Sequence, residues 1–165
     1  MRILQPILSQ GFYGSERYRI ELAIALAHAG HAVAIVLHGG ASDCARQFRR
    51  QIDGAELDAE GHEAGVLDLE VIPEWLPTWL HRPAFLRVIR RFAPDIVHTH
   101  LNPAARRVGP AAQWLGIPHV ATLHINYDAR EHARRDGLIA IASWQRPVFR
   151  QSFRARPGAA RGKSR

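Results

Sequence analysis

The segment from Gly11 to Arg17 carries the first residues whose types and spacing could bind a ligand. Its glycines stand where an apolar, strand-like stretch gives way to a helix-like pattern. A helix N-terminus presents unpaired N–H groups and positive potential, and glycine lets an anion approach the backbone. The segment therefore suits a phosphate or a hydroxyl-rich ligand, with these candidate contacts: Gly11, Gly14, Ser15, Glu16 and Arg17. The alternative is a tight turn that uses glycine only for its backbone freedom.

Two common nucleotide motifs are absent from this segment. A dinucleotide fingerprint needs Gly-x-Gly-x-x-Gly, and a P-loop needs Gly-Lys-Ser/Thr, and neither pattern is present. The later sequence His38-Gly39-Gly40 offers no acidic residue for a ribose. The glycines therefore predict an anion or sugar contact of another kind.

Three histidines form the second candidate group. His98 and His100 are two positions apart in an apolar stretch, so they share one face of an extended strand. His124 closes the stretch that follows Gly116-Ile117-Pro118. These side chains suit contacts to sugar hydroxyls, and the alternative is a polar set that caps the sheet edge. A metal site would need all three histidines, but no cysteine or carboxylate has matching spacing, and we expect no metal.

The elements that must position these residues alternate between strand and helix. We expect helices at Glu16–Ala29 (with Ser15 as N-cap and Gly30 as a stop), Asp43–Ile52, Pro83–Phe92, Pro103–Leu115 and, briefly, Gln145–Phe153. We expect strands at Arg2–Leu8, Ala32–Leu37, Val66–Ile72, Asp95–Thr99, His119–Leu123 and Leu138–Ala142.

This alternation predicts an α/β fold, a Rossmann-like parallel sheet of about six strands flanked by helices. In such sheets ligands bind beyond the carboxyl ends of the strands, at the point where the strand order switches. That rule selects three loops, Ser9–Ser15, His100–Asn102 and His124–Asp128. We expect the folded domain to cover residues 1–153, followed by a basic, disordered tail over residues 154–165.

Composition limits the remaining interpretations. The net charge is +7, but the last twelve residues hold five Lys or Arg and no acid, which leaves +2 for the rest of the chain. We therefore expect no nucleic-acid partner. The single cysteine, the lack of a signal peptide and the short apolar stretches predict a cytoplasmic protein. The aromatic segment Glu74–Arg82 should cover an edge of the sheet, or else meet an acceptor or the inner face of a membrane.

Taken in order, these segments resemble the N-terminal, acceptor-side domain of glycosyltransferase family 4, which is one half of the two-domain GT-B fold. The resemblance rests on residues 1–37, on PDIVHTHL, on GIPHVATLH and on LIAIAS, and it extends over about residues 1–153. It implies a retaining sugar transferase without a metal or other cofactor, which uses a nucleotide-diphosphate sugar as donor substrate. It also implies that His124 lies near the donor sugar, and that Ser143 joins Gly11–Arg17, His98 and His100 among the binding residues.

The donor-binding half of that family is missing from this sequence. No two glutamates have the family's Glu-x7-Glu spacing, and the sequence after Phe153 consists mainly of Arg, Gly, Ala and Pro. We therefore expect a truncated chain that is inactive alone. Two alternatives remain open: a partner subunit of a split transferase with a separately encoded donor-binding domain, and a non-catalytic α/β domain that binds an anion or small ligand.

Overall fold

Six parallel strands form one sheet in the order β3-β2-β1-β4-β5-β6. The computed structural model describes residues 1–8, 11–38, 43–53, 67–72, 76, 78–124, 135–147 and 150. The strands are β1 (Arg2–Ile7), β2 (Ala32–His38), β3 (Leu67–Ile72), β4 (Ile96–His100), β5 (His119–Leu123) and β6 (Gly137–Ala140). The helices are α1 (Gly14–His28), α2 (Asp43–Asp53), α3 (Thr78–Phe92) and α4 (Leu101–Trp114). The predicted α/β fold with a parallel sheet of about six strands is confirmed.

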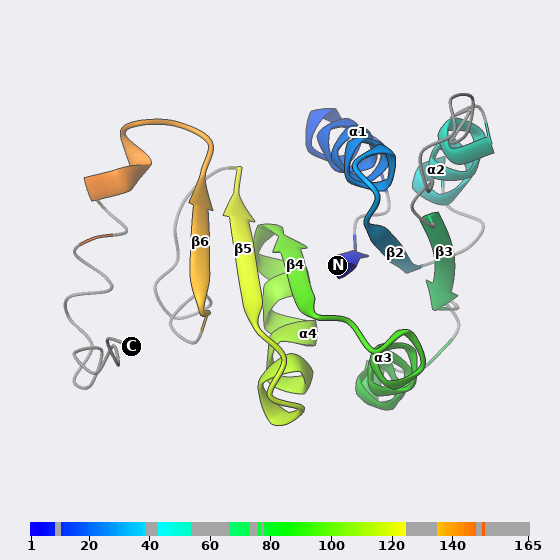
Figure 1. Cartoon of the computed structure of the whole chain (residues 1–165). Helices are drawn as coiled ribbons and strands as arrows, with labels where there is room; N and C mark the ends of the chain where they lie inside the picture. Colours follow the sequence, from blue (N-terminus) through cyan, green and yellow to red (C-terminus); the bar gives the residue numbers. More distant parts are fainter. Residues whose placement is uncertain are drawn as a thin grey trace.

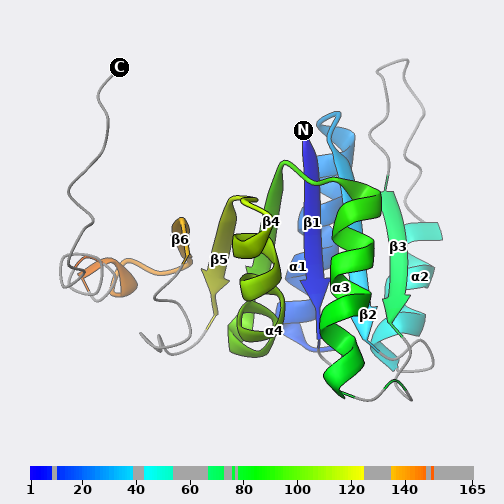
Figure 2. The same cartoon turned by 90° about the horizontal axis from the view of Figure 1, so that it is seen from below.

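The helices cover the two faces of the sheet as separate layers. Figures 1 and 2 show α1 and α2 on one face and α3 and α4 on the other. Alternate residues of β1 serve the two layers, because Ile7 packs with Ile20 of α1 while Leu4 packs with Phe85 of α3. Buried side chains on both faces explain why the central strands read as nearly continuous apolar runs.

Glycines end two helices as the sequence predicted. Gly30 follows α1 with a φ of 79°, and Gly116 follows α4 with a φ of 69°. Both angles lie in the left-handed region that other residues avoid, so these glycines turn the chain out of each helix and into the next strand.

Three predicted helix starts differ from the observed ones. Helix α1 begins at Gly14 with Tyr13 as N-cap, because the Glu16 carboxylate accepts the Tyr13 N–H (3.1 Å) and closes the first turn before Ser15 can. Helix α3 begins at Thr78, so Pro83 lies inside it rather than at its start. Helix α4 begins directly after β4, with His100 as its N-cap residue.

The C-terminal predictions lie largely outside the described residues. Of the expected helix Gln145–Phe153, the structure describes residues 145–147 and 150 as helical. The predicted tail at residues 154–165 lies outside the described residues, as do residues 74, 75 and 77 of the aromatic segment. None of the helices that the structure describes has the length and apolar character needed to span a bilayer.

Candidate functional site

The strand order reverses between β1 and β4, and this point defines the candidate site. Chain connections run from β1 outward to β2 and β3 on one side, and from β4 outward to β5 and β6 on the other. At the carboxyl edge, β1 leads toward α1, and His100 ends β4 as the N-cap of α4. Two helix N-termini thus begin at the same edge of the sheet, where the strand order predicts a ligand.

The three candidate histidines come together at this edge. His98 and His100 are neighbours on the α1 side of β4, with ring centroids 4.3 Å apart. The His100 ring lies 5.4 Å from that of His124, and His100 Nδ1 is 3.1 Å from His124 Nε2, within hydrogen-bond distance. His98 Nε2 lies 2.7 Å from Thr122 Oγ1 on β5. The predicted grouping of His98, His100 and His124 is therefore what the structure contains.

Burial increases from His124 inward through this cluster. His124 is partly exposed, His100 is 1% exposed and His98 is 7% exposed. Only His124 can therefore meet a ligand directly, while His98 and His100 lie behind it. The Nε2 of His100 is buried without a hydrogen-bond partner among the described residues.

All three imidazoles favour the neutral form. Burial, aided by the charges of His124 and Arg19, lowers the pKa of His98 to about 4. Burial, together with His98, Arg19 and His124, lowers the pKa of His100 far below its ordinary value. Burial and Arg19 lower the pKa of His124, with Glu16 opposing them. A neutral imidazole can both donate and accept a hydrogen bond, whereas a protonated imidazole can only donate. The neutral cluster therefore suits hydroxyl groups better than a protonated cluster would.

A buried ion pair in α1 covers the cluster. Arg19 and Glu16 are each 1% exposed, and Arg19 Nη1 lies 3.5 Å from Glu16 Oε1. Glu16 also accepts a hydrogen bond from Ser15 Oγ at 2.9 Å. Glu16 thus holds the start of α1 and its charge partner in place, and its predicted contact with a ligand stays a prediction.

Tyr18 forms the outer wall of the site on α1. Its ring meets His124 and His100 edge-on, with centroid distances of 5.3 Å and 5.9 Å. Tyr18 is 38% exposed, so part of it reaches solvent. A partly exposed aromatic ring next to hydrogen-bonding groups suits contact with the apolar face of a sugar ring.

The glycine segment lies at the start of α1. A Cβ on Gly11 would be 2.3 Å from Cε2 of Tyr13, so the Tyr13 ring occupies the space that the glycine leaves. Gly14 has no atom within 4 Å of such a position and is exposed. Arg17 points to solvent, where its Nε is 3.1 Å from Glu21 Oε1. Of the predicted segment, Gly14 and the partly exposed Ser15 offer the open backbone of the first helical turn.

The turn after β6 is fastened to β5 by one buried glutamine. Gln145 Oε1 accepts the N–H groups of Ile141 and Ala142, and its Nε2 donates to the carbonyl of Leu123 at 3.0 Å. That carbonyl belongs to the residue before His124. Ser143 lies exposed in the same turn. Gln145 thus positions the strand end that carries His124, and a binding role for Ser143 stays a prediction.

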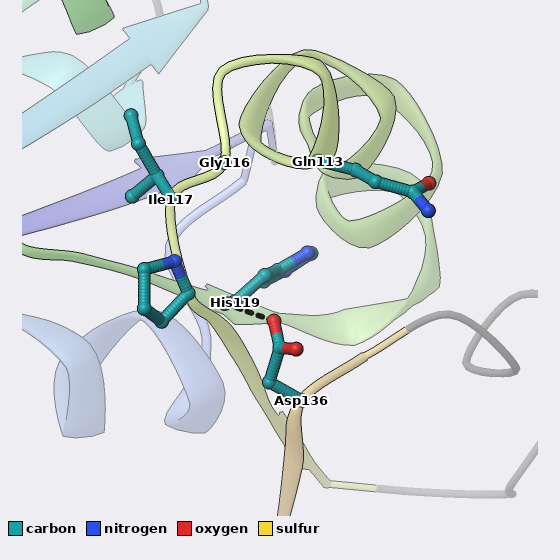
Figure 3. A pocket seen from close by; sticks show the side chains of 6 residues that line it. Gln113, Gly116, Ile117, His119 and Asp136 are labelled. Carbon is teal, nitrogen blue, oxygen red and sulfur yellow. Dashed lines mark hydrogen bonds between the residues drawn. The ribbon is translucent and has the colours of Figure 1, made fainter. Parts of the chain in front are cut away.

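A separate cavity of about 200 Å³ lies at the opposite end of β5 (Figure 3). The Asp136 carboxylate there accepts the backbone N–H of His119 at 2.8 Å, and His119 Nε2 is 2.8 Å from Thr99 Oγ1. The cavity is lined by Gln113, Gly116, Ile117, Pro118, His119 and Asp136. Because it lies at the amino end of the strand, it is distinct from the edge where α/β sheets bind ligands.

Within the described residues, no group of three or more His, Cys, Asp or Glu is arranged to hold a metal ion. His98 Nε2 lies within hydrogen-bond distance of Thr122, and His100 Nδ1 lies within hydrogen-bond distance of His124 Nε2. Sequence reasoning did not find Tyr18, Arg19, Thr122 and Gln145. Arg19 had one signal that could have revealed it: it lies three positions after Glu16, on the buried stripe of α1 that includes Ala23 and Ala27.

Solved structures match the fold of this chain. A glycosyltransferase from Rickettsia africae has 16% identity and a TM-score of 0.64, and the match covers 93% of this chain and 40% of that protein. HepE from Anabaena, solved in complex with UDP and glucose, has 17% identity and a TM-score of 0.62, covering 92% and 41%. MurG from Acinetobacter baumannii has 13% identity and a TM-score of 0.59, covering 99% and 43%. No significant match to the sequence occurs among the curated proteins.

The fold defines the chain as one half of a GT-B architecture, since it spans about 40% of each of these longer structures. The profile of Glycosyltransferase Family 4 matches residues 12–156. The chain therefore belongs to Glycosyltransferase Family 4, as the sequence resemblance predicted.

Proposed function

We propose that this chain is the acceptor-side half of a retaining glycosyltransferase that moves a sugar from a nucleotide-diphosphate sugar to an acceptor. The observation that carries the proposal is that His124, whose pKa is lowered by burial, lies against Tyr18 of α1 at the carboxyl edge of the sheet, where α1 begins. Neutral imidazole suits sugar hydroxyls, and a helix N-terminus suits a phosphate. Family membership supports the same chemistry.

In this proposal the chain positions substrates and contributes no nucleophile. His124 would hold a sugar hydroxyl, while the buried His100 orients the His124 ring through the contact between Nδ1 and Nε2. Tyr18 would cover one side of the same space. The N–H groups at the start of α1 would stabilise negative charge that develops on a departing diphosphate.

The second half of the cleft would come from a donor-binding domain. A GT-B site forms between two domains, so we expect this chain alone to show little or no sugar transfer. Robust transfer by the purified chain would contradict this part of the proposal and leave the assignment of the ligand edge intact.

Ligand contact can be tested on the chain by itself. Saturation-transfer NMR with UDP-glucose and with glucose should show transfer to the sugar protons. His124→Ala should weaken binding about fivefold, as expected for one lost hydrogen bond of about 1 kcal/mol. Gln113→Ala, in the separate cavity at the other end of β5, is the matched control and should change nothing.

Two outcomes would contradict the site. One is binding that survives His124→Ala unchanged, and the other is binding that Gln113→Ala removes. The second outcome would move the ligand to the cavity shown in Figure 3.

One observation favours the partner-subunit alternative. Ile139, Ile141 and Trp144 are 41%, 50% and 58% exposed at and just after β6. Large apolar side chains grouped at an edge strand suit a docked protein domain. If a separately encoded donor-binding domain docks there, Ile141→Glu should abolish its co-purification with this chain, whereas the exposed Arg146→Glu nearby should preserve it. Retention of the partner by Ile141→Glu would exclude this surface.

A further inference from the structure

Helices α3 and α4 carry positive charge alone. Together they contain six arginines and no aspartate or glutamate. By contrast, α1 and α2 on the other face mix four acidic with five basic residues. The small net charge of the chain outside the tail therefore conceals a strong separation between the two layers. The α3–α4 arginines with described, exposed side chains are Arg87, Arg90, Arg91, Arg106 and Arg107.

These side chains form one surface, which we call the α3–α4 arginine face. On α3, Arg87, Arg90 and Arg91 follow the spacing of one helical stripe, opposite the buried Phe85 and Ile89. Helix α4 lies beside α3 in front of the sheet in Figure 2 and contacts it. The exposed arginines of α3 and those of α4, Arg106 and Arg107, therefore lie on two neighbouring helices.

An exposed tryptophan lies in the same surface. Trp114, at the end of α4, is 63% exposed, and the Arg90 guanidinium stands 5.6 Å from its ring centroid. This contact joins α3 to α4 directly. It also places an amphipathic aromatic ring beside a cationic group.

Two described acids that precede strands of the sheet accept backbone hydrogen bonds. Asp95 Oδ2 accepts the backbone N–H of Arg2 at 2.7 Å, and Asp136 Oδ2 accepts that of His119 at 2.8 Å. Both belong to the strand entrances rather than to the helices. The helices themselves contribute no acidic residue to this face.

We infer that the α3–α4 arginine face binds the surface of an anionic lipid bilayer. Clusters of four to eight basic residues attract anionic headgroups, and tryptophan prefers the depth of those headgroups. The five exposed arginines of α3 and α4, together with the exposed Trp114, satisfy both conditions. The inference rests on charge and exposure on the face opposite α1 and does not depend on the proposed sugar chemistry.

A lipid surface explains this face better than a nucleic acid does. Single strands are bound in grooves with stacked bases, whereas this face is the outer side of two packed helices. A duplex offers its bases edge-on and gives the Trp114 ring nothing to stack on. In an anionic bilayer, the headgroups can bind the arginines and the headgroup layer can accommodate the Trp114 ring.

The test is co-sedimentation of the full chain with vesicles. Vesicles of phosphatidylcholine with about one-third phosphatidylglycerol should bind the protein, and pure phosphatidylcholine should not. Each arginine near an anionic surface raises binding about fivefold, so Arg87→Gln/Arg90→Gln/Arg107→Gln should weaken it on the order of 100-fold. The matched control, Arg17→Gln/Arg49→Gln/Arg50→Gln, removes the same charge from the opposite layer.

Four outcomes decide the inference. It is supported if the α3–α4 triple variant loses binding while the control triple variant binds like wild type, and if vesicles shift Trp fluorescence to shorter wavelength in wild type more than in Trp114→Phe. It is overturned if both triple variants lose binding equally, which indicates net charge alone. It is also overturned if only neutralising the five Lys and Arg of residues 154–165 removes binding, or if the α3–α4 triple variant loses affinity for a DNA duplex and keeps it for vesicles.

Discussion

Acidification should destabilise this protein through its buried histidines, and His98 allows the size of the effect to be worked out. The pKa of His98 is about 4 in the folded chain, against an ordinary value of 6.5. Between pH 6.5 and pH 4, His98 therefore binds a proton in the unfolded chain but stays mostly neutral in the folded chain. The stabilising contribution is complete above pH 6.5 and is lost progressively as the pH falls toward 4.

At pH 5 the loss due to His98 is about 2 kcal/mol, because a histidine with a pKa of 6.5 is then almost fully protonated and one with a pKa of about 4 is about one-tenth protonated. His100, whose pKa is lowered further by burial and by its neighbours, adds to the loss with the same sign. A loss of this size is a large share of the stability of a domain, which is commonly about 5–15 kcal/mol.

The assay is urea unfolding at pH 7.5 and pH 5.0, followed by circular dichroism. In His98→Gln the amide can keep a hydrogen bond to Thr122 but does not titrate, so the difference between the two pH values should shrink by about 2 kcal/mol. His28→Gln, which removes an exposed histidine at the end of α1, controls for the substitution itself. An unchanged pH dependence in His98→Gln, or an equal change in His28→Gln, would refute the reasoning.

Two further predictions concern stability. Arg19→Met leaves the buried Glu16 carboxylate without its ion pair, so it should lower the free energy of unfolding in urea by about 3–5 kcal/mol. Arg17→Met removes an exposed pair and should lower it by under about 1 kcal/mol. Equal losses in the two variants would contradict the role of burial. Gly116→Ala should cost about 1 kcal/mol, because φ is +69° and no neighbouring atom interferes, whereas Gly14→Ala in the first turn of α1 should be neutral or stabilising. A thermal melt in which Gly14→Ala lowers the melting temperature more than Gly116→Ala would contradict the explanation from the positive φ angle.

Much of the fold could be read from the sequence because its signals are local. Strand β5 was predicted with its observed bounds, and β1, β2 and α2 to within a residue or two. Apolar runs mark buried parallel strands, and Gly30 and Gly116 mark helix ends through a backbone angle that only glycine adopts easily. Helix starts were less accurate, because the cap of α1 depends on where the Glu16 side chain turns, which spacing alone does not decide.

Charge shows the same division between local and tertiary information. The sequence correctly located much of the basicity in the last twelve residues. It could not show that the remaining charges separate by layer, because that depends on which helices pack on the same face of the sheet. Only the packing of α3 against α4 brings Arg90 over Trp114 and makes one cationic surface.

The sequence by itself determined an α/β domain with His98, His100 and His124 at strand ends, because alternation and spacing are properties of the chain, and its resemblance to Glycosyltransferase Family 4 predicted the family that the match confirms. Only the tertiary structure decided how those histidines are grouped, how far each is buried and which protonation state they favour. Parallel pairing of β4 with β5 brings them into one cluster, and α1 covers that cluster with a buried Arg19. Burial and a nearby positive charge are long-range effects, and together they keep the imidazoles neutral and leave His124 as the exposed member of the set.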